Sequence, residues 1–136
     1  MLSPSAETFR LFLHVVAASV WVGGQFALAG LVPTLRRVAP GAVRSVAQAF
    51  ARVAWPAFGL TVITGMWGLM AEDVTTKSSS YQATLLLKIA IAILSGVFVV
   101  VHSVGRSKLA VALGGALGLL TAIGAMYLGI LLNTRG

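Results

Sequence analysis

The sequence contains no cysteine, and only three of its 136 residues are acidic. Without thiols, the chain can form no disulfide and no thiolate metal site, and it supports no thiol redox chemistry. The acidic residues, Glu7, Glu72 and Asp73, lie outside the long apolar runs. A proton-coupled exporter driven by a carboxylate within the membrane therefore lacks its titrating group. Phosphate-binding glycine loops, nucleophile elbows and the HExxH pattern are also missing, so soluble-type nucleotide or hydrolytic chemistry has no support.

Apolar residues are abundant. They make up 58% of the chain, charged residues make up 10%, and the mean hydropathy is +0.96. Four apolar runs cover roughly 8–32, 48–71, 82–104 and 109–132, and about 20 such residues allow a helix to cross a bilayer. The runs are too long and too continuously apolar for the alternating strands of a barrel. We therefore predict an all-α integral membrane protein, with a single transmembrane domain over residues 1–136 folded as a four-helix bundle.

The ends of the predicted helices are marked by capping residues and prolines. Ser5 precedes a helix start, Pro33 is expected to end the first span, and Pro40-Gly41 is typical of a turn. The second helix is expected to begin near Arg44. Further along it, small residues predict a face that lets another helix pack closely: Thr61, Gly65 and Gly68.

The charges are distributed unevenly between the connections, and the net charge is +7. The first connection and its borders carry four arginines, Arg36, Arg37, Arg44 and Arg52. The third connection carries Arg106 and Lys108, whereas the second is mixed and contains Glu72, Asp73 and Lys77. Basic loops stay on the cytoplasmic side of a membrane, so both termini are predicted to lie outside. This topology accounts for the positive charge without a nucleic-acid partner. Basic loops could also contact anionic lipid head groups, although a topology signal alone explains them.

One histidine lies inside the first apolar run, within the segment HVVAASVWVGG that starts at His14. Ionisable groups are costly in the hydrocarbon region, so a functional site is the default hypothesis. His14, Ala18, Trp21 and Gln25 share one helical face, and the glycines that follow Trp21, Gly23 and Gly24, allow close approach of another backbone. The alternative for His14 is a buried imidazole that bonds a helix hydroxyl or carbonyl.

In the third run Lys88, Ser95 and His102 recur every seven residues and should form one stripe. Lys88 and His14 both lie about 10 Å inside the outer boundary, so the two could meet. Alternatively, Lys88 reaches out to the interface. His102 lies about 21 Å further along its helix, so His14 and His102 are not expected to bind one small metal or to clamp one haem.

The fourth run contains a GxxxG motif, Gly114 to Gly118. Such a motif can mediate dimerisation, but it also packs helices within one bundle. Both interpretations stay open, and a homodimer or a larger membrane complex is a possible assembly.

The predicted topology gathers one histidine, one lysine and three methionines in the outer half of the bundle: His14, Lys88, Met66, Met70 and Met126. Imidazole and thioether groups ligate redox metals and haem iron, although methionine more often fills apolar gaps. An ammonium beside the site would disfavour Cu⁺ unless the lysine were neutral, whereas it could neutralise a haem propionate. This contrast favours haem b, with His14 as axial ligand and Lys88 as propionate partner or proton-transfer group.

Tryptophans are the remaining candidates, since Trp21 shares the His14 face. Trp21, Trp55 and Trp67 are more typical of packing or of the membrane interface than of a cofactor site. We still include Trp21 among the candidate cofactor-binding residues, which are His14, Lys88, Trp21, Met66, Met70 and Met126, with His14 as the metal ligand.

The chain resembles CopD-like (copper resistance D) membrane proteins in three features. These are His14 followed by Trp21-Val22-Gly23-Gly24, Lys88 early in the third helix, and the four-span layout. The shape is also similar to that of the related bacterial protoporphyrinogen oxidases of the HemJ type. The resemblance implies a four-helix protein of the bacterial inner (cytoplasmic) membrane that handles copper or binds haem b. The resemblance also implies that His14 is a ligand and that Lys88 is a second functional position. The oxidase activity is not carried over. Alternatives are a copper transport or resistance component using His and Met ligands, and a structural subunit of a larger membrane complex.

Overall fold

The computed structural model describes all 136 residues and consists almost entirely of helix. Its four long helices are α1 (Ala6–Val38), α2 (Val43–Ala71), α3 (Ser79–Val104) and α4 (Lys108–Arg135), and the short 3₁₀ segments are η1 (Pro40–Ala42) and η2 (Val74–Thr76). Each long helix is long and apolar enough to cross a membrane. The prediction of an all-α chain with four such helices is confirmed. The helices extend past the predicted apolar runs because their polar first and last turns are also helical.

Three helices begin at serine side chains that accept a hydrogen bond from the first turn. Ser5 and Thr8 form a capping box at α1, while Ser78 and Ser107 cap α3 and α4. Such side chains satisfy backbone N–H groups that have no partner within the helix. The predicted start after Ser5 is therefore confirmed, and α2 begins at Val43, next to the predicted Arg44.

The prediction that Pro33 ends the first helical span is wrong. Pro33 lies inside α1, which continues to Val38. Proline removes only one intrahelical hydrogen bond, the one to the Ala29 carbonyl, and the turns beyond it can still form. The helix ends at Val38, and its cap residue Ala39 has left the helical region, with φ −150° and ψ 65°. A helical conformation is disfavoured at Ala39 because Pro40 follows it.

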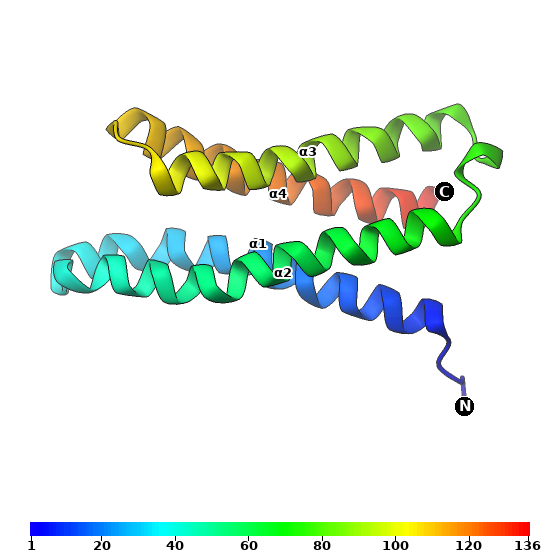
Figure 1. Cartoon of the computed structure of the whole chain (residues 1–136), viewed down its shortest axis with the longest axis horizontal. Coiled ribbons are helices and arrows are strands. Elements are labelled where there is room, and N and C mark those ends of the chain that lie inside the picture. The colour runs from blue at the N-terminus through cyan, green and yellow to red at the C-terminus, as the bar shows by residue number, and fades with distance from the viewer. The chain divides into compact units, whose positions relative to one another are not determined.

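The chain divides into two compact units, Met1–Glu72 and Asp73–Gly136. In the first unit α1 and α2 pack side by side as an antiparallel hairpin around η1, and in the second α3 and α4 form another (Figure 1). The single transmembrane domain over residues 1–136 and its four-helix bundle stay predictions.

The first hairpin is held by an aromatic cluster and by close contacts at small residues. Trp21 of α1 is 5% exposed, and its ring centroid lies 5.2 Å from that of Trp55 and 4.6 Å from that of Phe58, both on α2. About one helical turn beyond Trp21, the Phe50 ring occupies the space that a Cβ on Gly24 would need. Gly24 thus accommodates a side chain rather than a backbone, whereas Gly23 faces open space.

The second hairpin packs through the small residues of α4. Its buried positions follow helical spacing: Gly114, Gly118, Ala122 and Ala125. A Cβ on Gly114 would lie 2.7 Å from the backbone nitrogen of His102 and 2.8 Å from the Phe98 carbonyl oxygen, so the backbones of α3 and α4 nearly touch there. The GxxxG motif is therefore occupied by α3 of the same chain, which agrees with the packing alternative. The homodimer stays a prediction.

Large apolar side chains are exposed on all four helices, including Phe12, Ile63, Ile93 and Leu120. Apolar surface of this extent is unusual in soluble monomers but fits lipid. The exposed side chains and the helix lengths are those of a multi-pass membrane protein.

Candidate cofactor site around His14

His14 is half-buried on α1 and is held by a threonine of α2. Its Nδ1 lies 2.8 Å from the hydroxyl oxygen of Thr64. That hydroxyl donates to the Leu60 carbonyl at 2.7 Å, with the Thr61 carbonyl 3.2 Å away. Because a hydroxyl has only one proton, Thr64 must accept from His14, and Nδ1 carries the hydrogen. In the neutral ring, Nε2 is then the nitrogen with the lone pair.

The small-residue face predicted on α2 is where α1 packs. A Cβ on Gly65 would lie 3.5 Å from His14 Cε1, and one on Gly68 would lie 2.6 Å from Arg10 Nη1. Thr64, directly before Gly65, is 1% exposed. The missing side chains let the imidazole and the guanidinium lie close to α2, which confirms the prediction of close packing at this face.

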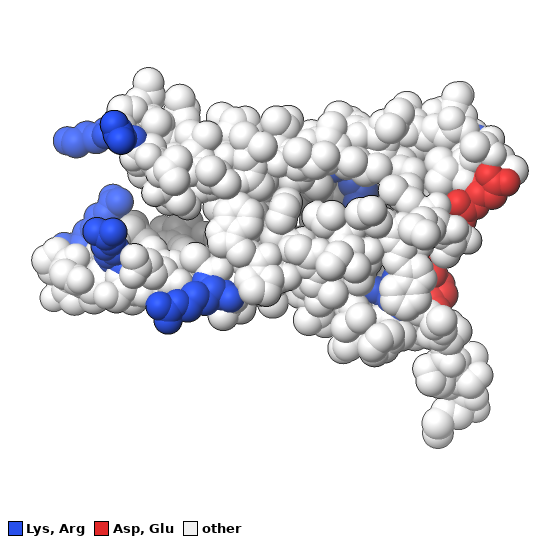
Figure 2. Space-filling model, viewed as in Figure 1, with Lys and Arg blue, Asp and Glu red and all other residues white.

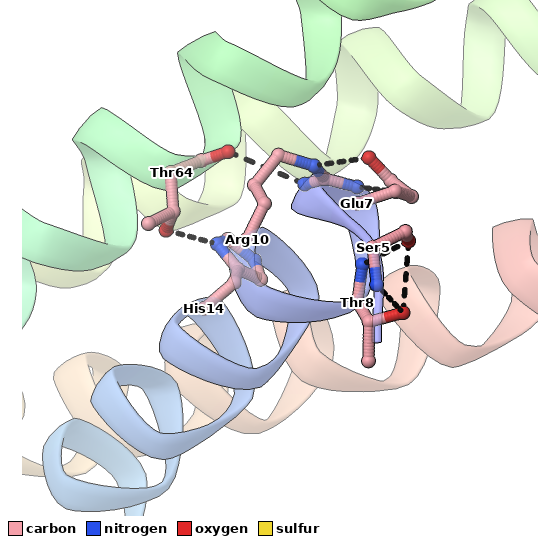
Figure 3. A network of polar contacts seen from close by, with 6 residues as sticks. All are labelled: Ser5, Glu7, Thr8, Arg10, His14 and Thr64. Carbon is pink, nitrogen blue, oxygen red and sulfur yellow. Dashed lines mark hydrogen bonds and ion pairs between the residues drawn. The ribbon is translucent and has the colours of Figure 1, made fainter. Parts of the chain in front are cut away.

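Arg10 and Glu7 extend the polar network one turn toward the start of α1 (Figure 3). Arg10 donates from Nη1 to the Thr64 carbonyl at 3.3 Å and from Nε to Glu7 Oε2 at 2.9 Å. Its Nη2 forms an ion pair with the same carboxylate. Thr64 therefore binds two side chains of α1, His14 through its hydroxyl and Arg10 through its carbonyl.

Trp21 lies on the same face of α1 as His14, two turns further along. Its contacts with Trp55 and Phe58 place it in the core of the hairpin. This is the packing role that the sequence favoured for the tryptophans. Contact of Trp21 with a cofactor stays a prediction.

Met66 and Met70 do not lie on the side of α2 that carries Thr64. Each residue turns a helix by about 100°, so Met66, two residues after Thr64, lies about 160° from it around α2, nearly on the opposite side. The two methionines are 56% and 84% exposed. Met126 belongs to the second unit and is half-buried on α4. Ligation by any of the three stays a prediction.

The stripe predicted on the third helix is confirmed, because all three of its members face α4. Lys88 Nζ lies 3.2 Å from where a Cβ on Gly129 would be. Ser95 donates to the Gly118 carbonyl at 2.9 Å, and His102 Nδ1 donates to the Val111 carbonyl at 2.7 Å. His14 and Lys88 belong to different units, so their predicted meeting stays a prediction.

Sequence reasoning missed Thr64 and Arg10 as members of the site. A signal for Thr64 was present, since it lies between Thr61 and Gly68 on the predicted small-residue face. The hairpin turn supplied another: His14 lies 26 residues before Pro40 and Thr64 lies 24 residues after it. Antiparallel helices bring such residues to nearly the same level.

Three comparisons with known proteins gave no relative. The chain matches no family model, no curated protein and no solved structure at a significant level. Its function must therefore be inferred from the chemistry of its own residues.

The donor set around His14 consists of one imidazole. No group of three or more His, Cys, Asp or Glu side chains lies close enough together to hold a metal ion. A metal ion bound by protein side chains alone generally takes three or four of them. Haem iron already has four porphyrin nitrogens and takes one or two axial ligands from the protein. A lone histidine with a fixed tautomer therefore fits haem better than a bare ion.

Proposed function

We propose that this chain is a CopD-like multi-pass membrane protein that binds haem b through Nε2 of His14 and serves in electron transfer or in metal or haem handling. The observation that carries the proposal is the hydrogen bond from His14 Nδ1 to Thr64. We further propose a bacterial inner-membrane location with both termini outside, because the arginines cluster at the α1–α2 turn.

Histidines that ligate metals usually donate their other ring N–H to a protein oxygen, which fixes the tautomer and the ring orientation. Thr64 does this for His14, and Gly65 leaves room for the ring beside α2. The Glu7 carboxylate balances the charge of Arg10 close by. Haem, when bound, would supply reversible one-electron chemistry.

The test is an optical spectrum of the detergent-purified protein, produced with ample haem, before and after dithionite reduction. We expect a Soret band that sharpens on reduction, disappears in His14→Ala and persists in His102→Ala. His102 is the matched control because it is the other histidine of the chain and also donates through Nδ1, to a backbone carbonyl. Far-UV circular dichroism would verify that both variants stay helical.

A colourless wild-type protein would contradict the proposal, as would equal loss of the band in both variants. Growth of a deletion strain on copper would then test the copper component. Partners that co-purify with the colourless protein would indicate a structural subunit.

A further inference from the structure

Four arginines surround the turn of the first hairpin. Arg36 and Arg37 lie in the last turn of α1, Arg44 lies in the first turn of α2, and Arg52 follows about two turns later. All four are exposed. In Figure 2 most of the blue side chains of this hairpin gather toward the η1 end, and no red atoms are visible there. We call Arg36, Arg37 and Arg44 the arginine turn.

The acidic residues of this unit cannot neutralise the arginine turn. Glu7 is at the start of α1 and Glu72 follows the end of α2, so both lie at the far end of the antiparallel hairpin. Thirty helical residues separate Glu7 from Arg37, which corresponds to about 45 Å. Salt screens exposed charges beyond about 8 Å. In addition, Arg44 lies near the positive end of the α2 dipole, where a cation is disfavoured.

We propose that the arginine turn binds the phosphate groups of anionic phospholipids. The turn connects two helices that are long and apolar enough to span a membrane, so in a bilayer it lies at the level of the head groups. The planar guanidinium fork donates two parallel hydrogen bonds to phosphate oxygens, which an ammonium cannot do.

The presence of arginine rather than lysine distinguishes lipid binding from a topology signal. Lysine and arginine serve equally well as topology signals, yet the first unit contains five arginines and no lysine. Replacing the arginine turn by lysines therefore keeps the charge and the expected topology but removes the guanidinium forks. This surface does not involve His14 and is independent of the proposed cofactor.

The experiment is native mass spectrometry of the full chain in detergent, with phosphatidylglycerol and phosphatidylcholine of identical acyl chains added at equal concentration. Attraction of each basic residue to anionic lipid corresponds to about a fivefold change in occupancy. We expect a preference of at least about fivefold for phosphatidylglycerol. It should fall at least about fivefold in R36Q/R37Q/R44Q and fall by less in R36K/R37K/R44K.

The matched control is K77Q/R135Q, which removes cations from the second unit and should keep the preference. Equal binding of the two lipids by the wild type, or a preference that is unchanged in R36Q/R37Q/R44Q, would overturn the proposal. A lysine variant that behaves like the wild type would rule out recognition by guanidinium forks. Displacement of the lipid by millimolar inorganic phosphate would identify a soluble phosphate as the occupant and also contradict it. Circular dichroism would confirm that every variant is folded.

Discussion

At the scale of single residues, Thr64 holds together the polar end of the first hairpin. Its hydroxyl accepts from His14 and donates to Leu60, while its carbonyl accepts from Arg10. The hydroxyl has no proton left for the imidazole, so the tautomer of His14 follows from the sequence of α2. A change at Thr64 that preserves shape but not polarity should therefore affect His14 without removing it.

We expect Thr64→Val to lower the free energy of unfolding and Thr64→Ser to preserve most of it. Valine has nearly the same shape as threonine but cannot accept the His14 hydrogen. Hydrogen bonds between membrane helices contribute about 0.6 kcal/mol on average and up to about 1.7, so the loss should lie in this range. Unfolding of the full chain in mixed detergent micelles with increasing dodecyl sulfate would measure it. Equal stabilities of the two variants would show that the hydroxyl does not hold His14.

At the scale of helices, glycines set how closely the elements approach. Gly24 accommodates the Phe50 ring, Gly68 the Arg10 guanidinium and Gly129 the Lys88 ammonium, whereas Gly114 lies against backbone. In lipid, helices gain little from burying apolar surface, so close van der Waals contact at small residues becomes the main source of association. The consequences of adding a methyl group should depend on what each glycine faces.

We expect Gly114→Ala to destabilise the second hairpin by about 1–3 kcal/mol, the usual cost of overpacking. The new Cβ would lie 2.7 Å from a backbone nitrogen, which cannot move aside as a side chain can. The helices must separate, and the Ser95 bond to Gly118 would lengthen. The same unfolding assay would detect the loss.

Gly30→Ala is the matched control for this prediction. Nothing lies within 4 Å of the Cβ position on Gly30, so its stability should be unchanged or slightly higher, because alanine favours helix. Equal destabilisation by both substitutions would contradict the packing of the GxxxG motif against α3.

Sequence patterns predicted the helices well because each apolar run and each capping serine acts locally. The seven-residue stripe of α3 and the small-residue face of α2 were also predictable, since helical periodicity fixes which residues share a side. A bond from His14 to a helix hydroxyl was the stated alternative, and the structure has one. The identity of the partner, Thr64, was not predicted, because it depends on how far one helix is displaced along its neighbour. Pro33 was misjudged because a proline with regular turns on both sides costs a helix one bond rather than ending it. The thioether ligands expected near His14 stay predictions, and the periodicity of α2 places Met66 and Met70 on other sides of that helix than Thr64.

At the scale of the whole molecule, the uneven charges predict an orientation in the membrane with both termini outside. Because the chain has no cysteine of its own, a single introduced cysteine can be labelled to test this orientation. We expect a membrane-impermeant maleimide to label Ser80→Cys in intact cells but to label Ser45→Cys only after permeabilisation. The two residues are matched: both are exposed serines in the first turns of a helix. Ser45 follows the α1–α2 turn with its arginines, which should stay inside, and Ser80 follows the connection that contains Glu72 and Asp73. The opposite labelling pattern would reverse the proposed topology.

The contacts of Lys88, Ser95 and His102 with α4 also fix the register of the second hairpin. If α3 moved along α4 by one helical turn, about 5.4 Å, Ser95 would lose the Gly118 carbonyl and His102 would lose the Val111 carbonyl. Lys88 would also leave the space beside Gly129. Because these contacts are spread along most of α3, they would all be lost together. Sliding of α3 along α4 by one turn would therefore cost all three contacts, which opposes that movement.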